Sequence, residues 1–232
     1  MKKDIYEIEK NLDKIYRGEA TGFLTNSTKT TIEKRLSKVN YEVFKPFDEA
    51  EKTILYKDKY PRVRLFKILC YKDEEIKHSS IMGSLFGLNI TGEMFGDIIK
   101  YKDNFYVYVL DSISDLVLRE FKMVGNIYIK LEEVDGDYLK DFKREYERIE
   151  LIVSSLRIDT VISRLIHCNR DLIFDKVKDK EIFVNDVCIT KANGQLKLGD
   201  VFSIKRFGKF KFREILGNTK KDNYIIVIDK FI

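Results

Sequence analysis

Apolar residues recur at helical spacing near the start of the chain. Side chains three or four residues apart predict an amphipathic helix over residues 4–17 and a second helix over residues 29–37. Residues 41–44 have the composition of a strand, and Pro46 ends it because proline cannot donate a hydrogen bond to a sheet. A small α+β unit is therefore expected at residues 1–62.

A different pattern of short strands and helices starts at residue 63. The predicted order is strand, helix, two strands joined by a short turn, helix and strand, which is the split βαβ arrangement. RNA-recognition modules use this topology, but so do many proteins that bind no RNA. Phe105, Tyr106 and Tyr108 alternate along one strand, so one subset could face solvent. Core packing is the favoured interpretation. The strand does not begin with the basic residue, glycine and aromatic residue that open the base-stacking strands of RNA-recognition modules.

Two short helices are predicted in the last third of the chain. An apolar stripe from Ile158 to Ile166 predicts the first, and Arg157 and Arg164 are expected to share its opposite side because they are seven residues apart. Asn169 has a suitable side chain to cap the second helix. Arg170 in the first turn opposes the helix dipole slightly, a cost that a bound phosphate would offset.

Turn residues predict hairpins after these helices. Asn185-Asp186 suits a two-residue hairpin turn, because both residue types tolerate positive φ. Gly199-Asp200 predicts a further turn, and a basic hairpin is expected to reverse at Gly208. The basic residues of this hairpin alternate with Phe207, Phe210 and Phe212.

The predicted fold class is α+β, with three small units. Residues 1–62 form the N-terminal unit, and residues 63–136 form a middle unit with the topology of ferredoxins and RNA-recognition modules. A charged helix over residues 137–150 is expected to connect them to a last unit, residues 151–232.

The positive charge is concentrated in that last unit. The 232 residues carry a formal net charge of +5, yet residues 151–232 alone hold 16 Lys and Arg against 10 Asp and Glu. Such localised charge is typical of a nucleic-acid-binding surface, because basic groups neutralise phosphates and release counterions. The expected RNA contacts are Arg157, Arg164, Arg170, Lys205, Arg206, Lys209 and Lys211, and Lys220 and Lys221 are further candidates.

Residue types and spacing do not point to catalysis. The sequence has no phosphate-binding glycine loop, and its two histidines and three cysteines lie at no metal-ligand spacing. The cysteines fit reduced, buried thiols of a cytosolic protein. No apolar stretch approaches the ~18 residues of a membrane helix, and the start of the chain is too acidic for a signal peptide. We therefore expect a cytoplasmic, monomeric protein that is not an enzyme and has no catalytic residue, metal, cofactor or membrane partner.

Several motifs in residues 151–232 resemble the αL RNA-binding domain named after ribosomal protein S-four. That domain has R-[LI]-D, Ser-Arg, V-x-V-N and G-D motifs in this order. The corresponding residues are Arg157-Ile158-Asp159, Asn169-Arg170, Ile182-Phe183-Val184-Asn185 and Gly199-Asp200. Asn169 keeps the capping oxygen of the usual serine, and Lys180 replaces a glycine before the strand. The resemblance implies that Asp159 orients a basic residue or caps the turn.

Longer stretches resemble the YlmH family over nearly the whole chain. GDVFSIKRFGKFKFREILGNTKKDN, residues 199–223, is similar to that family's G-D-x-x-S-x-R-G-x-G-R-F…G-x-T-K-K-G-R tail. HSSIMGSLFGLNITGEMFGDII, residues 78–99, resembles its H-R-D-x-L-G-x-L-x-G-L-G-I-x-R-x-x-x-G-D-I motif. Ser79-Ser80 and Thr91-Gly92 stand where the family has Arg-Asp and a basic residue, so this part has lost positive charge.

The resemblance to YlmH and to RqcP-like quality-control factors implies a partner and a role. It implies binding of structured rRNA and tRNA on the large ribosomal subunit, in ribosome-associated quality control of stalled peptidyl-tRNA complexes. The protein would brace tRNA against rRNA without chemistry of its own. Two alternatives stay open. One is an RNA-modification activity or accessory role in the middle unit, and the other is an adaptor that binds a quality-control or cell-division protein.

Overall fold

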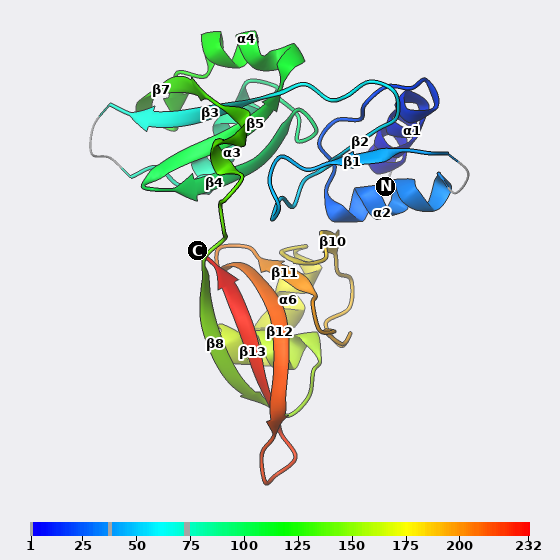
Figure 1. Ribbon diagram of the computed structural model, residues 1–232. Helices are drawn as coiled ribbons and strands as arrows, with labels where there is room; N and C mark the ends of the chain where they lie inside the picture. The colour runs from blue at the N-terminus through cyan, green and yellow to red at the C-terminus, as the bar shows by residue number, and fades with distance from the viewer. Residues whose placement is uncertain (1, 37–38, 72–74) are drawn as a thin grey trace. The chain divides into compact units, whose positions relative to one another are not determined.

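The chain folds into two units, each built around its own hydrophobic cores (Figure 1). The computed structural model describes residues 2–36, 39–71 and 75–232. Unit 1 spans Met1–Lys143 and unit 2 spans Arg144–Ile232. Both units combine helices with antiparallel sheets, which confirms the predicted α+β class. Within the described residues, no helix is both long and apolar enough to cross a membrane.

Unit 1 begins with two helices that the apolar spacing predicts. They are α1 (Lys2–Tyr16) and α2 (Asn26–Arg35). Thr25 caps α2 by accepting a hydrogen bond from Thr28 N, so the helix starts three residues earlier than predicted. The predicted end at Ser37 lies outside the described residues. The predicted strand is β1 (Glu42–Phe44), and it pairs with β2 (Ile54–Tyr56), which the sequence analysis missed.

The middle of unit 1 has the predicted split βαβ topology. Its antiparallel sheet has the strand order β4-β5-β3-β7-β6, in which β5 lies between the two strands that flank the first helix. The elements are β3 (Val63–Cys70), α3 (His78–Gly87), β4 (Phe95–Tyr101), β5 (Asn104–Leu110), α4 (Asp111–Glu120), β6 (Met123–Val124) and β7 (Ile127–Val134). The short β6, which the predicted order did not include, starts three residues after the end of α4 and pairs with β7.

The prediction of a charged helix over residues 137–150 is wrong. Gly136–Leu139 forms a single 3-10 turn, η1, and Tyr146–Val153 is strand β8. The end of β8 has the period of a strand, because Leu151 and Val153 are buried whereas Ile152 is exposed. All eight residues of β8 pair with β13 (Tyr224–Phe231), so long-range pairing overrides the helical tendency of the charged side chains.

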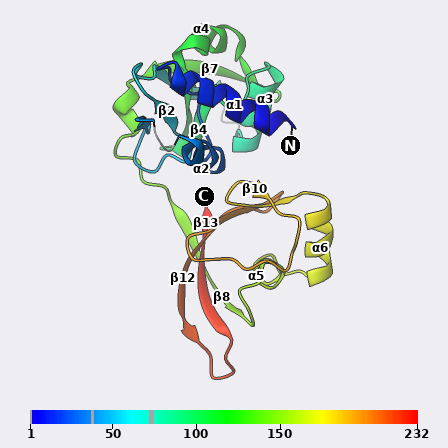
Figure 2. The same cartoon turned by 90° about the vertical axis from the view of Figure 1, so that its right-hand side faces the viewer.

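Unit 2 packs two helices on one face of a six-stranded antiparallel sheet (Figure 2). The helices are α5 (Ile158–Leu165) and α6 (Arg170–Lys178), and the strand order is β10-β9-β11-β12-β13-β8. The remaining strands are β9 (Ile182–Val184), β10 (Val187–Cys188), β11 (Val201–Ile204) and β12 (Gly208–Asn218). Asn185 and Asp186 have φ of 50° and 63°, which confirms the predicted hairpin turn.

Lys180 ends α6 in the left-handed conformation, with φ of 57°. Lys180 N donates to Val177 O at 3.1 Å, and Glu181 N donates to Lys176 O at 2.9 Å. This pair of hydrogen bonds is the Schellman arrangement, in which glycine is the usual residue at the position of Lys180. The turn before β9 therefore keeps its geometry without the glycine.

Candidate nucleic-acid interface

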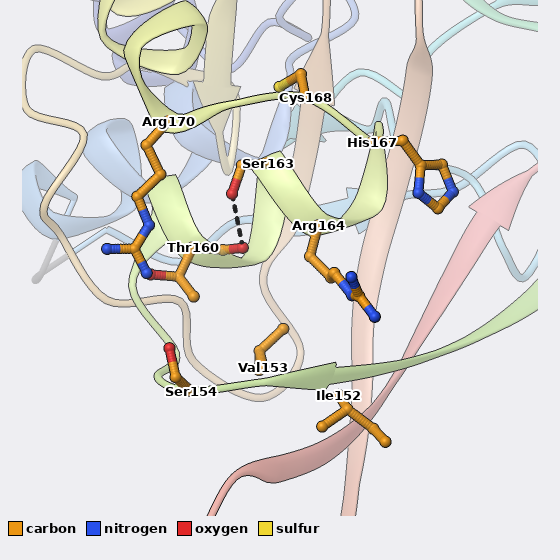
Figure 3. Close-up of a pocket in the computed structure, with 9 residues that line it drawn as sticks. All are labelled: Ile152, Val153, Ser154, Thr160, Ser163, Arg164, His167, Cys168 and Arg170. Carbon is orange, nitrogen blue, oxygen red and sulfur yellow. Dashed lines mark hydrogen bonds between the residues drawn. The ribbon is translucent and has the colours of Figure 1, made fainter.

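A pocket of about 350 Å³ lies where α5 and the start of α6 meet the end of β8 (Figure 3). Hydroxyl, imidazole and guanidinium groups dominate its lining. The nine lining residues are Ile152, Val153, Ser154, Thr160, Ser163, Arg164, His167, Cys168 and Arg170. No Asp or Glu is among them, so the pocket is electropositive and suits an anion.

Arg164 and Arg170 bring their charges to this pocket from two different helices. Arg164 lies in the last turn of α5, and Arg170 is the first residue of α6. Neither guanidinium forms an ion pair with any residue that the structure describes. Asn169 caps α6 as predicted, because its side-chain oxygen accepts a hydrogen bond from Leu172 N at 3.4 Å. This cap fixes the position from which Arg170 projects.

Arg157 is held by Asp159 and is not part of the pocket lining. Arg157 Nε and Nη2 donate to the two carboxylate oxygens of Asp159 at 3.0 and 2.8 Å. These hydrogen bonds hold the pKa of the buried Asp159 carboxyl below its usual range. Thr160 N also donates to Asp159 Oδ1, at 2.9 Å. Asp159 therefore orients a basic residue, one of the two roles that the resemblance implied, and it does so from within the first turn of α5, whose N-terminus has no side-chain cap.

The basic residues of the β11–β12 hairpin divide between its loop and one face of the sheet. Lys205 and Arg206 lie in the loop, where Lys205 Nζ is 3.1 Å from Glu181 Oε1. Lys209 and Lys211 lie in β12 and alternate with phenylalanines that belong to the core under α5 and α6. Because strand side chains alternate, both lysines face away from the helices. Lys209 Nζ lies 5.3 Å from the centre of the Phe231 ring.

Lys220 and Lys221 lie in the turn between β12 and β13, at the far end of β12 from Lys205 and Arg206 (Figure 1). β12 has 11 residues, so roughly 35 Å separate its two ends. The structure therefore does not bring the nine predicted contacts to one surface. Arg164 and Arg170 share a pocket, and the other predicted contacts lie at Asp159, in the hairpin loop, on the opposite sheet face and in the distant turn.

The middle sheet does not offer the aromatic face of an RNA-recognition module at Tyr106 and Tyr108. α3 and α4 pack on one face of this sheet, and both tyrosines lie on the other face, where each is 1% exposed. Phe47 stacks on Tyr108, and Tyr138 stacks on Tyr106. The Tyr108 hydroxyl donates to Gly136 O at 2.9 Å. This confirms core packing for both residues, so no base can stack on them.

The cysteines provide no reactive or metal-binding centre in the described part of the chain. Cys70, Cys168 and Cys188 form no disulfide in the described part of the chain, and each is half-buried rather than fully buried as expected. Burial raises the pKa of the Cys168 thiol, so this group is protonated at neutral pH. Among the described residues, no group of three or more His, Cys, Asp or Glu is placed to hold a metal ion.

Comparison with known proteins identifies relatives of the chain. Residues 58–138 match the family model described as the putative RNA-binding domain in YlmH. The chain is 27% identical over 155 residues to the ribosome-associated protein quality control protein P2 of Bacillus subtilis (strain 168). That alignment covers 67% of this chain and 60% of the relative, so the chain spans about three fifths of its length. The cell division protein ylmH from Streptococcus pneumoniae aligns with a TM-score of 0.45 at 20% identity, over 57% of this chain and 92% of that chain.

These matches confirm the predicted resemblance to the YlmH family. The family model falls on the middle unit, whereas all nine candidate contacts lie after residue 150. The motif at residues 78–99 lies in the same unit, although Ser79-Ser80 and Thr91-Gly92 leave it without the basic residues of the family pattern.

Proposed function

We propose that this chain, as a relative of the YlmH family, is an RNA-binding protein of ribosome-associated quality control. Its proposed ligands are structured rRNA and tRNA of the large ribosomal subunit that retains a stalled peptidyl-tRNA. The proposal rests on the pocket that carries Arg164 and Arg170, neither of which forms an ion pair with a residue that the structure describes. The family match over residues 58–138 supports RNA as the ligand, and the name of the Bacillus subtilis relative supports the setting. A cytoplasmic location follows from this role.

In the proposed mechanism, the α5–α6 pocket binds phosphates of the RNA backbone. Guanidinium groups match phosphate geometry because they donate parallel hydrogen bonds, and both arginines start from helices that fix their positions. Ser154 in the lining adds a hydroxyl group that can donate to a phosphate oxygen, and Ser163 Oγ, which donates to Thr160 O at 3.1 Å, can still accept from a ribose 2′-hydroxyl. Such a site reads the shape of a structured RNA and holds it in place, and no bond is made or broken by this chain.

The other predicted contacts take part through separate surfaces of unit 2. Arg157, Lys205 and Arg206 would extend the contact. Arg157 is paired with Asp159 and Lys205 with Glu181, and these ion pairs weaken the positive charge that the two residues offer to RNA. Lys209 and Lys211 lie on the sheet face away from the helices, and Lys220-Lys221 lies at the end of β12. These four lysines would reach a second segment of a large RNA, such as two helices of one rRNA domain.

A charge-matched pair of double variants tests the pocket. We expect Arg164→Ala with Arg170→Ala to weaken binding of a tRNA and to lower the log–log salt slope by about 1.5, because two phosphate contacts are lost. Lys191→Ala with Lys197→Ala removes the same charge from exposed positions outside the candidate set and should leave the slope nearly unchanged. Binding would be titrated over a series of salt concentrations. Equal effects of the two double variants would refute the pocket as the phosphate site.

A further inference from the structure

Phe207 is an exposed aromatic side chain at the tip of the basic hairpin. Three phenylalanines alternate with the basic residues of this hairpin, and the structure gives them different environments. Phe210 and Phe212 are 3% and 0% exposed and belong to the core of unit 2, whereas Phe207 is 41% exposed. The Phe207 ring is therefore the one of these three that a ligand can reach.

The loop that carries Phe207 is fixed to the end of α6 by several contacts. Phe207 N donates to Ile204 O at 3.0 Å, and Lys205 N donates to Glu181 O at 3.0 Å. The Glu181 carboxylate binds two ammonium groups, with Lys176 Nζ at 2.8 Å and Lys205 Nζ at 3.1 Å. Lys176 Nζ also lies 5.4 Å from the centre of the Phe207 ring. The ring is therefore presented by an ordered loop, with a cation against it.

The surroundings of the ring carry excess positive charge. One carboxylate, Glu181, faces the two ammonium groups of Lys176 and Lys205. Arg206 is exposed beside them and forms no ion pair with any described residue. Its φ of 72° places it at the left-handed position of the three-residue loop. An accessible aromatic ring surrounded by cations is the combination that binds a nucleobase and its flanking phosphates.

We infer that Phe207 stacks on an unpaired nucleobase of the bound RNA, while Lys205 and Arg206 bind the adjoining phosphates. This inference rests on the proposed RNA-binding function and names the part of the RNA that the hairpin contacts. Loops, bulges and ends expose bases that can stack on an aromatic side chain, whereas paired bases inside a helix cannot. The hairpin would thus recognise a single-stranded feature next to the structured RNA that the α5–α6 pocket binds.

Two RNA probes and two substitutions separate stacking from charge and from folding. The probes are an RNA hairpin with an unpaired loop and a blunt, fully paired RNA duplex of similar length. Phe207→Leu keeps an apolar side chain without a ring, and Phe207→Tyr keeps the ring. We expect Phe207→Leu to weaken binding of the hairpin RNA about tenfold, within the range for loss of one base–aromatic stack, with no change for the duplex. Phe207→Tyr should bind both probes as the unsubstituted protein does.

A fluorescence experiment tests the contact directly, because the sequence has no tryptophan. Phe207→Trp introduces a single indole at the hairpin tip, and stacking on a base should quench its emission when the hairpin RNA is added. Leu216→Trp is the control, since Leu216 is 48% exposed in β12, the strand that follows the loop, and lies on the order of 25 Å from the tip along that strand. Quenching at Phe207→Trp alone supports the inference, whereas equal quenching or none at both positions overturns it.

Failure of the inference is distinguishable from failure of the proposed function. If the unsubstituted protein binds both probes with salt-dependent affinity and Phe207→Leu binds them equally well, stacking is refuted and RNA binding stands. If the unsubstituted protein binds neither probe at any salt concentration, the proposed function and the inference are both refuted. Circular dichroism of each variant checks that the fold is intact.

Discussion

Replacing Lys180 by glycine is expected to stabilise unit 2, although the substitution removes a side chain. Lys180 has φ of 57°, where the Cβ of an L residue crowds its own backbone. The hydrogen bonds from Lys180 N to Val177 O and from Glu181 N to Lys176 O require this conformation. The Lys180 side chain is exposed and forms no ion pair with any described residue, so its removal breaks no such contact.

The size of the effect follows from two opposing terms. The left-handed conformation costs a residue with a Cβ about 1–2 kcal/mol, which glycine avoids. Glycine adds conformational freedom to the unfolded chain, which lowers stability by about 0.4–1 kcal/mol. The two ranges combine to a net gain in the free energy of unfolding of about 0–1.6 kcal/mol, and the middle of that range, about 0.8 kcal/mol, raises Tm by about 3–6 °C for a unit of this size.

Scanning calorimetry of the full chain measures this gain, with Lys191→Gly as the matched control. Lys191 is also an exposed lysine of unit 2, but its φ is not positive. Glycine there should lower the stability by about 0.4–1 kcal/mol, since only the unfolded-state term remains. A Tm for Lys180→Gly at or below that of the unsubstituted protein would refute the reasoning, as would equal shifts for the two variants.

Three further substitutions test other contacts. Asp159→Asn weakens the bidentate pair with Arg157 and should cost about 1–2 kcal/mol in urea unfolding at pH 7. Because folding lowers the Asp159 pKa, this contribution is present above the unfolded pKa and is lost as pH falls through the folded value, so the variant should lose less stability on acidification. If both proteins lose the same stability between pH 7 and pH 3, that assignment is wrong. Tyr108→Phe removes the hydrogen bond to Gly136 O and should cost about 1 kcal/mol. Asn169→Ala removes the cap of α6 and should cost about 1 kcal/mol, measured by urea unfolding, whereas an unchanged midpoint would contradict the cap.

The sequence correctly predicted those elements that are determined by residue types at a few neighbouring positions. The Asn169 cap and the Asn185-Asp186 turn depend on side chains and backbone conformations at those positions, so their residue types were sufficient. Strand β8 was missed because its charged residues resemble a solvated helix until Leu151 and Val153. Its partner β13 lies about 80 residues further along the chain. Pairing between strands so far apart cannot be predicted from the pattern of a short stretch of sequence.

The candidate site was predicted in composition but not in arrangement. The excess of basic residues after residue 150 and the alternation of the hairpin's basic residues with phenylalanines were both apparent in the sequence. Which face α5 and α6 cover depends on packing, and only the structure shows that the lysines lie opposite the helices. The ion pair between Lys205 and Glu181 also joins separate elements, so the charge near Phe207 was not apparent from composition alone.

The covered face of the middle sheet has a consequence for dissecting the protein into fragments. The segment recognised by the family model, residues 58–138, is shorter than the part that folds as one core. Phe23 and Phe47 precede this segment and Phe142 follows it, yet all three pack with Tyr106 and Tyr108. A truncated piece cut at the limits of the recognised segment would expose a cluster of aromatic rings and tend to aggregate. Experiments on the isolated RNA-binding segment therefore need residues from about Phe23 through Phe142 to keep this surface buried.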